Sequence, residues 1–506
     1  MFVTFVTKDR ILFYIFGKHS IKLIYYELKS ISMKVEQLFT GCLAEMAYYV
    51  ESNGEVAIVD PLRETAPYLK MAEADGAKIK YIFLTHFHAD FVSGQVDLAK
   101  KTGAKIIFGP NATAKYDIYV GKDGEEFPLG GGKITLLHTP GHTMESSSYL
   151  ITDEEGNTPC VLSGDCLFIG DVGRPDLAVK SDLTQADLAG HLYDSLRNKI
   201  MTLPDDIIVY PNHGAGSACG KNMSSETFDT LGNQKKTNYA LRADMTKEEF
   251  IKEVTTGLKT PPQYFPLNVM LNKNGADKTY DEILTKGTTP LDAATFKELS
   301  EQKDVMVIDT RTKEAYSENG TVPGAWWIGL NGSFAPWVGA LIVDVNQKVI
   351  FIVDDEAKAR EAVTRFSRIG FDNTLGYLAG GGLSDWLAHG YEIDKIGSIS
   401  AAGFEKKMNN GEVEIALDVR KETEYLSEHI KGIENFPLDT IKQNFAEIKT
   451  DKTYYLHCAS GYRSLIAASI FKANGVENVV DIRGGFKDLS ETDLPKTEYV
   501  CPTTLL

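Results

Sequence analysis

Short apolar runs that end in turns or polar clusters recur along the first half of the chain. From Met33, the segment MKVEQLFTGCLAEMAYYVESNGEVAIVDP contains two apolar runs joined by Ser-Asn-Gly, which predicts a β-hairpin. The segment KIKYIFLTHFHADFVSGQVDLAKKTGAKIIFGP predicts a buried strand to Leu84, a polar loop, a helix that ends near Gly103 and a further strand. The pattern therefore places polar loops directly after apolar strands.

Two copies of one pattern fill the second half of the chain. TPLDAATFKELSEQKDVMVIDTRTKEAY and SISAAGFEKKMNNGEVEIALDVRKETEY each predict a short helix, a turn and a strand that ends in Asp-x-Arg. A second strand, a helix, a third strand and a Gly-rich stretch follow in each copy. Because strand and helix alternate, each copy is predicted to be a small doubly wound α/β unit with a parallel sheet.

The length of the chain and these patterns predict several domains. At about 150 residues per domain, 506 residues predict about three folded units. Residues 1–32 differ in composition from the rest of the chain and are expected to be an extension outside the fold, with Met33 as the natural start. We then expect a first domain over 33–258, a linker over 259–288 and the two repeats over 289–397 and 398–506. In the linker, Tyr264, Phe265 and Met270 are expected to pack on another part of the protein.

Charge and composition argue against several classes of protein. The chain carries 70 acidic and 53 basic residues, a formal charge of −17, which argues against binding to nucleic acid or to an anionic membrane. No run of about 20 apolar residues occurs, so we expect no membrane span and a soluble protein. Six scattered cysteines lack the dense spacing of a disulfide framework and are predicted to be reduced thiols in the cytoplasm. They are Cys42, Cys160, Cys166, Cys219, Cys458 and Cys501.

Histidines are concentrated between residues 86 and 213, where six of the ten lie. Side chains of the types that bind metals follow four predicted strands: His86, His88 and Asp90 in HFHAD, His142 after KITLLHTPG, Asp165 after CVLSG, and His213 after DIIVYPN. Such strand ends could converge on one edge of a sheet layer, where a rigid scaffold can hold a metal. For the two remaining histidines of this region, His138 and His191, we favour the simpler interpretation as core residues.

At these residues the sequence resembles the metallo-β-lactamase superfamily, over about residues 35 to 255. The resemblance implies two packed β-sheets flanked by helices. The family motif H-x-H-x-D-H appears as HFHADF, with Phe91 where a histidine of the second metal normally stands. A phenyl ring cannot donate a lone pair, so one metal at His86, His142 and Asp165 is expected rather than two. Two imidazoles and one carboxylate with open positions are typical of non-haem Fe(II) that activates oxygen, with zinc as the alternative.

The segments SGDCLFIGDVGRPDLA and PNHGAGSACGKNMSSE are similar to the persulfide dioxygenase branch of this superfamily. That resemblance implies a mononuclear iron that oxidises a low-molecular-weight persulfide with O2 to sulfite and a thiol. It implies two sets of residues. His86, His142 and Asp165 match the iron ligands, whereas His88, Asp90 and His213 match metal positions of the superfamily and are expected to orient ligands or water, with metal binding as the alternative. Arg174 and Asp176 match a GRPD signature and are expected to pair and shape the pocket. Cys219 is expected to be inert rather than reactive.

The segment HCASGYRSLIAASIFKANGVENVVDIRGGF closely resembles the rhodanese sulfurtransferase loop. Cys458 follows a strand and the loop to Arg463 opens a helix, so backbone N–H groups, the helix N-terminus and the guanidinium are expected to stabilise a thiolate and bind an anionic sulfur donor. Cys458 is therefore predicted to accept a sulfane sulfur as a covalent persulfide. Four residues between Cys458 and Arg463 favour this chemistry over a phosphatase-like loop. The predicted anion-binding loop contains Ala459, Ser460, Gly461, Tyr462 and Ser464.

The first repeat lacks this nucleophile. Aligning VIFIVDD with YYLHCAS is taken to place Asp354 at the position of Cys458 and Ala359 at the position of Arg463. This copy is predicted to be an inactive rhodanese-like module that serves as a spacer, a dimer contact or a docking surface.

The whole arrangement resembles fused persulfide dioxygenase-sulfurtransferases. Sulfite made at the iron could accept sulfur from a Cys458 persulfide and leave as thiosulfate, or the reverse transfer could feed persulfide to the iron. The expected partners are a small-molecule persulfide, O2 and sulfite or thiosulfate, and we expect a homo-oligomer. Two alternatives stay open: a zinc-dependent thioester hydrolase of the glyoxalase II kind, against which Phe91 argues, and a sulfur carrier or sensor that oxidises nothing.

Overall fold

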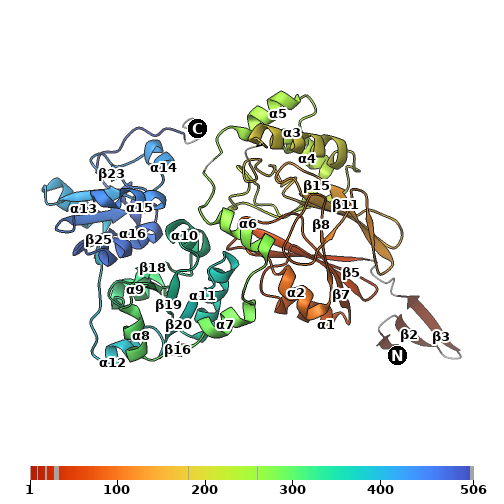
Figure 1. Cartoon of the computed structure of the whole chain (residues 1–506), viewed down its shortest axis with the longest axis horizontal. Helices are drawn as coiled ribbons and strands as arrows, with labels where there is room; N and C mark the ends of the chain where they lie inside the picture. Colours follow the sequence, from red (N-terminus) through yellow and green to blue (C-terminus); the bar gives the residue numbers. More distant parts are fainter. Residues whose placement is uncertain are drawn as a thin grey trace. The chain divides into compact units, whose positions relative to one another are not determined.

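The structure of the chain is a computed structural model in which two compact units are distinguished (Figure 1). It describes the backbone of residues 2–7, 10–17, 20–27, 33–179, 182–258 and 260–501, with side chains from residue 33 onward. The first unit contains Met1–Thr40, Ala44–Phe87 and Gly94–Thr256, and the second contains Gly41–Leu43, His88–Ser93 and Gly257–Leu506.

Two six-stranded sheets form the body of the first unit, in the strand orders β4-β5-β6-β7-β8-β9 and β10-β11-β12-β13-β14-β15. The first sheet contains β4 (Lys34–Thr40), β5 (Glu45–Ser52), β6 (Glu55–Val59), β7 (Lys78–Phe83), β8 (Lys105–Phe108) and β9 (Tyr119–Val120). The second contains β10 (Glu126–Leu129), β11 (Gly132–His138), β12 (Ser147–Thr152), β13 (Cys160–Gly164), β14 (Ile208–Pro211) and β15 (Asp229–Thr230). Buried side chains from both sheets, including Tyr48, Phe83, Ile134 and Leu162, form one apolar core.

Helices cover the two sheets of the first unit. The helices are α1 (Ala66–Ala74), α2 (Gln95–Thr102), α3 (Gln185–Ser195), α4 (Leu231–Thr237) and α5 (Lys247–Thr255). Helices α1 and α2 contact β7 of the first sheet. Leu192 of α3 and Phe250 of α5 are buried in a second apolar cluster with Val161 and Val209 of the second sheet. This sandwich of two sheets between helices is the architecture that the sequence resemblance implied.

The local predictions for the first unit are confirmed. Strands β5 and β6 pair antiparallel, and Asn53 and Gly54 form the turn with positive φ values of 46° and 80°. Helix α2 ends at Gly103, whose φ of 73° lies in the left-handed region that favours glycine. Strands β1 (Phe2–Thr7), β2 (Arg10–Gly17) and β3 (Ser20–Glu27) form a three-stranded antiparallel sheet with β2 in the middle. Whether residues 1–32 are an extension that precedes the natural start stays a prediction.

The second unit contains two parallel five-stranded sheets with the same strand order (Figure 1). The first repeat contributes β16 (Pro290–Leu291), β17 (Val305–Asp309), β18 (Trp326–Trp327), β19 (Lys348–Ile352) and β20 (Thr374–Leu378). The second contributes β21 (Gly397–Ile399), β22 (Ile415–Asp418), β23 (Glu434–Asn435), β24 (Thr453–His457) and β25 (Asn478–Ile482). The prediction of two similar α/β units is therefore confirmed.

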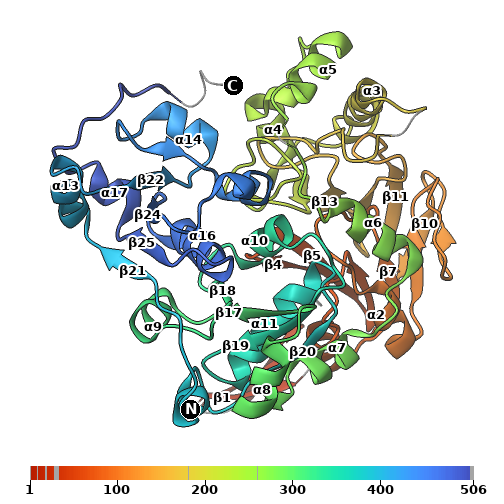
Figure 2. The same cartoon turned by 60° about the vertical axis from the view of Figure 1, so that its left-hand side comes forward.

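Helices alternate with the strands of both repeats. The first repeat contains α8 (Ala293–Ser300), α9 (Lys313–Asn319), α10 (Phe334–Leu341), α11 (Glu356–Arg368) and α12 (Ser384–Ala388). The second contains α13 (Ala401–Asn409), α14 (Glu422–Ser427), α15 (Ile441–Asn444), α16 (Tyr462–Ala473) and α17 (Gly485–Leu489). Helix α16 is buried along most of its length and contacts both β24 of its own sheet and β18 of the first repeat (Figure 2).

The sheet register corrects the predicted alignment of the two repeats. Asp309 of β17 lies opposite Ile352, and the equivalent Asp418 of β22 lies opposite His457. The residue after each strand is therefore Val353 in the first repeat and Cys458 in the second, so the equivalence of Asp354 with Cys458 is wrong by one residue.

The loop that follows the strand is also one residue shorter in the first repeat. The loop before α11 reaches its N-cap, Asp355, two residues after Val353, whereas Gly461 caps α16 three residues after Cys458. The second residue of α11 is then Ala357, at the place of Arg463, rather than Ala359. The first repeat still has neither the cysteine nor the arginine.

The segment expected to be a linker contains two helices, α6 (Phe265–Asn274) and α7 (Tyr280–Gly287). Tyr264 and Phe265 are buried, as predicted, but Met270 is 54% exposed. Helix α7 contacts α11 and β20 and therefore packs on the first repeat. Among the residues that the structure describes, no helix is both long enough and apolar enough to cross a bilayer.

Candidate metal centre and sulfur-transfer loop

His86 lies in the loop after β7, and its ring is oriented by a network of buried polar groups. Its Nδ1 atom lies 3.0 Å from the Thr85 hydroxyl, which donates to Asp60 Oδ2 at 2.9 Å. The side-chain amide of Asn212 donates to both groups, at 3.0 and 2.6 Å. Because the Thr85 proton is directed to the carboxylate, His86 Nδ1 must be the donor to the hydroxyl. The lone pair of His86 is therefore on Nε2.

His142 and His213 are oriented by the same principle. His142 Nδ1 lies 2.9 Å from the carbonyl oxygen of Arg174, and His213 Nδ1 lies 3.3 Å from that of Ala44. A carbonyl oxygen accepts only, so each Nδ1 carries the proton and each Nε2 is the lone-pair atom. Hydrogen bonds of this kind fix the tautomer of histidines that bind metals.

The three Nε2 atoms face the carboxylate of Asp165, which lies in the turn after β13. His142 Nε2 is 3.4 Å and His86 Nε2 is 3.9 Å from Asp165 Oδ2, and His213 Nε2 is 3.6 Å from Oδ1. Ligand atoms that each lie about 2 Å from one metal ion are roughly 3 to 4 Å apart. The residues expected as ligands, His86, His142 and Asp165, are thus brought together in one buried group.

The surroundings of Asp165 test whether this group fits a metal ion. Asp165 is 2% exposed, and neither of its carboxylate oxygens has a hydrogen-bond donor among the residues that the structure describes. A buried carboxylate without a donor is costly unless a cation compensates its charge. A divalent cation between Asp165, His86 and His142 would satisfy all three groups, so the residues present fit a metal.

His213 belongs to a second buried group with Asp165 and Cys219. His213 follows β14, as predicted, and approaches Asp165 as closely as the two expected histidine ligands do. The prediction that His213 orients ligands or water instead of binding the metal stays a prediction.

His88 and Asp90 lie in the segment His88–Ser93, which belongs to the second unit. Both residues are buried, and the Phe91 ring stacks on the His88 ring at 4.3 Å between centroids. The side-chain amide of Asn272 donates to the carbonyl oxygens of His88 and Phe91, both at 2.8 Å. Phe91 is fully buried and thus takes a packing position where the family motif has a histidine.

The remaining predictions for this region concern Arg174, Asp176, His138 and His191. Arg174 and Asp176 form the expected ion pair, with two parallel hydrogen bonds of 2.6 Å. The Arg174 carbonyl oxygen also accepts the hydrogen bond from His142 Nδ1, so this segment orients a candidate ligand. His138 and His191 are half-buried and belong to none of the ligand groups found in the described residues.

Sequence reasoning missed the residues that orient His86. Asp60 is fully buried, directly follows β6 and accepts hydrogen bonds from the backbone N–H and the hydroxyl of Thr85. The signal was present in GEVAIVDP, where an acidic residue ends a buried strand just as the other candidates do. Asn212 directly precedes His213, but only the fold shows that its amide reaches Asp60.

In the second repeat, Cys458 directly follows β24 and is buried. The N–H of Gly461 donates to Cys458 Sγ at 3.1 Å, and the Ser464 hydroxyl lies 3.7 Å from the same sulfur. Gly461 has a φ of 97°, a conformation that glycine adopts without strain, and this directs its N–H at the sulfur. The backbone of the loop thus donates one hydrogen bond to the sulfur, and the predicted anion-binding role of the loop stays a prediction.

Arg463 is paired with Glu424 rather than bonded to the sulfur. Its two terminal nitrogens donate to Glu424 at 2.5 and 2.8 Å, and among the described residues its guanidinium makes no hydrogen bond to Cys458 Sγ. Burial alone would raise the pKa of Glu424, but the hydrogen bonds and charge of Arg463 outweigh it and lower the pKa. The predicted role of Arg463 in binding an anionic donor stays a prediction.

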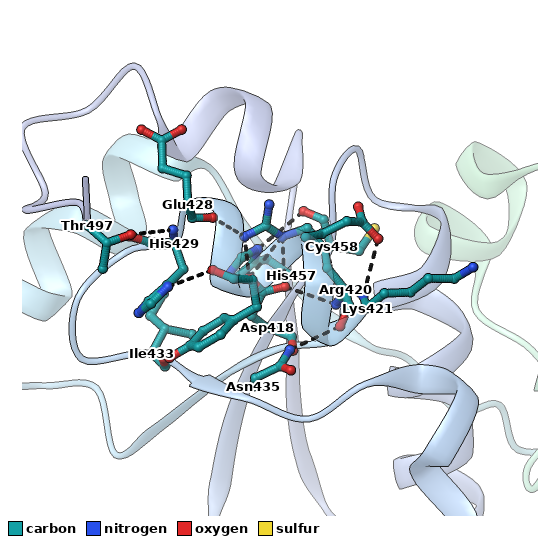
Figure 3. Close-up of polar contacts among 12 residues, drawn as sticks. Asp418, Arg420, Lys421, Glu428, His429, Ile433, Asn435, His457, Cys458 and Thr497 are labelled. Carbon is teal, nitrogen blue, oxygen red and sulfur yellow. Dashed lines mark hydrogen bonds and ion pairs between the residues drawn. The ribbon is translucent and has the colours of Figure 1, made fainter. Parts of the chain in front are cut away.

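The Asp-x-Arg pairs at the ends of β17 and β22 are buried structural ion pairs. Figure 3 shows Asp418 and Arg420 close to Cys458, and Arg420 Nη2 donates to Asp418 at 2.7 Å and to the Glu428 carbonyl oxygen at 2.8 Å. Asp309 and Arg311 pair in the same way in the first repeat. The presence of this pair in the copy without cysteine indicates a role in the fold.

The buried carboxyl group of Asp481 is hydrogen-bonded to Ser464, near the start of α16. The Ser464 hydroxyl donates to Asp481 Oδ1 at 2.6 Å. Burial raises the pKa of Asp481 to about 6, although the Ser464 hydrogen bond and the charges of Lys313 and Arg483 act in the opposite direction. Lys313 belongs to the first repeat, so the electrostatic surroundings of this loop include a residue from the other copy.

Comparisons with known protein families match three separate regions of the chain. Residues 40–213 match the metallo-beta-lactamase superfamily, and residues 292–389 and 400–492 each match the rhodanese-like domain. The chain therefore combines a metallo-beta-lactamase domain with two rhodanese-like domains.

Three known proteins are similar to parts of this chain that range from 43% to 69% of its length. The mitochondrial persulfide dioxygenase ETHE1 of Homo sapiens is 28% identical over 243 residues, which are 47% of this chain and 87% of the human protein. A probable metallo-hydrolase of Burkholderia pseudomallei is 25% identical over 257 residues, 43% of this chain and 84% of that protein. The crystal structure of a metallo-beta-lactamase from Staphylococcus aureus is 28% identical with a TM-score of 0.59, and it covers 69% of this chain and 99% of that chain.

Proposed function

We propose that the first domain oxidises a low-molecular-weight persulfide with O2 to sulfite and a thiol, and that Cys458 transfers sulfane sulfur to or from small sulfur anions. The observation that carries this proposal is the buried group of His86, His142 and Asp165, because Asp165 has no other hydrogen-bond donor among the described residues. The likeness to the human persulfide dioxygenase supports the substrate class.

The chain's own residues have definable tasks in the oxidation. Fe(II) held by His86, His142 and Asp165 would supply the one-electron chemistry that lets triplet O2 react with a closed-shell persulfide anion. Thr85 and the Arg174 carbonyl oxygen keep the Nε2 lone pairs of His86 and His142 directed at that position. The reaction balances as RSS⁻ + O2 + H2O → RSH + SO3²⁻ + H⁺.

The sulfur transfer is a nucleophilic exchange that needs no oxidant. The sulfite sulfur attacks the outer sulfur of a Cys458 persulfide, the S–S bond breaks, and its electron pair stays on Cys458 as the thiolate. The products are the free cysteine thiolate and thiosulfate, and the reverse reaction loads Cys458. The Gly461 N–H, 3.1 Å from Sγ, stabilises the negative charge on the leaving sulfur.

Metal analysis and oxygen uptake test this proposal. The full chain, purified without oxygen, is expected to contain about one iron per molecule and to consume O2 when a small persulfide such as glutathione persulfide is added. His142→Ala should lose both iron and oxygen uptake. Cys458→Ser should keep oxygen uptake and lose sulfur transfer between thiosulfate and sulfite, measured with labelled sulfur.

Three results would contradict the proposal. Two zinc ions per chain with no oxygen uptake would support a hydrolase instead. Equal loss of both activities in Cys458→Ser would show that the functions are not divided between the domains in this way. Sulfur transfer only to an added protein would indicate a carrier.

Three further expectations stay predictions from the sequence: a cytoplasmic location, a homo-oligomer and the domain limits.

A further inference from the structure

The first rhodanese-like copy reaches the cysteine loop of the second. Lys313, the first residue of α9, extends to Gly461: its Nζ lies 3.6 Å from the position that a Cβ atom would take on that glycine. The N–H of the same glycine donates to Cys458 Sγ. The ammonium group and the reactive sulfur are thus placed at one short loop, although they come from different repeats.

A packed contact between the two repeats holds this arrangement. The Tyr462 hydroxyl donates to the carbonyl oxygen of Gly329 at 2.7 Å, and the Tyr462 ring lies 5.2 Å from the Trp327 ring. Any Cβ on Gly332 would overlap the Tyr462 ring, at 2.4 Å, so a glycine is needed where the two copies meet. These contacts fix the cysteine loop against the first repeat.

Trp327 also connects this contact to Lys313. Its indole N–H donates to the carbonyl oxygen of Arg311, two residues before Lys313, at 3.0 Å. Its backbone N–H donates to the Ser469 hydroxyl of α16 at 2.9 Å. The backbone just before α9 and the helix that follows Cys458 are therefore both hydrogen-bonded to Trp327, which fixes the start of α9 relative to the cysteine loop.

Among the described residues, two other cations near the loop are held in ion pairs, whereas Lys313 is not. Arg463 pairs with Glu424, and Arg420 pairs with Asp418. In the part of the chain that the structure describes, no Asp or Glu forms an ion pair with Lys313, which is half-buried. Its charge acts on Asp481, where it opposes the larger effect of burial on the pKa of that carboxyl.

We propose that Lys313 binds the small sulfur oxyanion, sulfite or thiosulfate, that reacts at Cys458, so that the inactive copy completes the active site of the active one. This rests on the sulfur transfer proposed above. Lys313 offsets part of the charge of the incoming dianion and takes no part in proton transfer. The role also explains why a copy without a nucleophile is packed so closely against the cysteine loop.

The test compares reagents that differ in charge but react with the same thiol. Iodoacetate is an anion and iodoacetamide is neutral, so the ratio of their rates at Cys458, followed by mass spectrometry of the Cys458 peptide, reports attraction of anions without any enzymatic turnover. In Lys313→Met this ratio is expected to fall on the order of tenfold, because the loss of a positive charge beside the loop weakens the attraction of the anionic reagent, and solvent and salt screening keep the effect well below the unscreened Coulomb value. The KM for thiosulfate should rise while kcat changes less.

Matched variants separate charge from structure. Lys313→Arg keeps the charge and should keep the wild-type ratio. Lys348→Met removes a lysine of the same repeat that pairs with Asp304 at the surface, and it should change nothing. Lys313→Gln repeats the charge loss if methionine disturbs the packing, and circular dichroism checks the fold.

An unchanged reagent ratio and KM in both neutral variants would overturn the assignment of Lys313. Absence of thiosulfate transfer by the wild-type chain would overturn the proposed function instead. The reagent ratio does not depend on that activity, so the two failures are distinguishable.

Discussion

At the scale of single residues, the candidate metal centre depends on which nitrogen of each histidine carries its proton. His86, His142 and His213 each direct Nδ1 to an oxygen atom, and this leaves Nε2 facing Asp165. A ring with the opposite tautomer would present a proton instead of a lone pair. The residues that fix the tautomers are therefore as important to the site as the ligands.

Thr85→Val tests this orientation. The change removes the hydroxyl that accepts from His86 Nδ1 while it keeps the size of a buried side chain. We expect metal affinity to fall about 10- to 100-fold, the range found when an orienting partner is lost, measured by metal retention against a chelator. Thr139→Val is the control, because Thr139 is equally buried and its hydroxyl contacts that of Ser148, at 3.1 Å, instead of a candidate ligand. Equal metal retention in both variants would contradict this account.

Asp481 makes stability depend on pH. Its pKa of about 6 in the folded protein exceeds the ordinary 3.8, so between these values the folded state keeps a proton that the unfolded state loses. Stability therefore falls as pH rises through this window, by up to about 3 kcal/mol at neutral pH. Asp481→Asn should remove this loss, and its gain in free energy of unfolding over wild type should be larger at pH 7.5 than at pH 4.5.

The measurement is urea unfolding of both proteins at the two pH values, compared as differences so that other titrating groups cancel. Asp493→Asn, at an exposed aspartate of the same repeat, is the control and should show no such pH-dependent gain. A gain of equal size at both pH values would show that the buried charge of Asp481 is not the cause.

At the scale of elements, both candidate sites are built on the ends of strands. His86 follows β7 and Asp165 follows β13, and Cys458 follows β24 in the same way. The sheets fix the backbone up to the last strand residue, and the short loop beyond it places the functional atom. In the first repeat the loop after β19 is one residue shorter and contains no left-handed glycine.

Gly461→Ala tests how far the cysteine loop depends on its backbone conformation. A residue with a Cβ at a φ of 97° is strained by roughly 1 to 2 kcal/mol, which favours a loop that no longer directs its N–H at Cys458. Sulfur transfer should fall, on the order of tenfold, while oxygen uptake stays at the wild-type level. Gly475→Ala carries similar strain at the end of α16, with a φ of 85°, and should leave both activities unchanged. A loss of oxygen uptake in Gly461→Ala would contradict the division of functions.

At the scale of the whole molecule, the negative net charge of the chain bears on how an anion can bind near Cys458. A formal charge of −17 disfavours the approach of anions such as sulfite, so an anion site needs a local positive charge. In the second repeat the buried arginines are already paired with carboxylates. A lysine supplied by the first repeat meets this need and gives the inactive copy a task beyond that of a spacer.

Much of the fold and of the candidate sites was predictable from local sequence. Apolar runs followed by turns predicted the hairpin of β5 and β6 and the helix that ends at Gly103. Strand-end polar residues predicted His86, His142, Asp165 and Cys458 as candidates. The equivalence of Asp354 with Cys458 is one residue out of register, because VIFIVDD and YYLHCAS aligned without a gap place Val353 opposite Cys458. The equivalence of Ala359 with Arg463 fails as well, because the loop after β19 is one residue shorter than the loop after β24.

The sequence by itself determined the division into a metal-binding class of domain and two α/β repeats, because periodicity and motif spacing are local properties of the chain. Only the tertiary structure decided which groups meet: Asp60 with Thr85, Arg463 with Glu424, and Lys313 with Gly461. The partners in these pairs are separated by 25 to more than 100 residues of chain. Their contact is set by the packing of sheets and repeats, which no local pattern encodes.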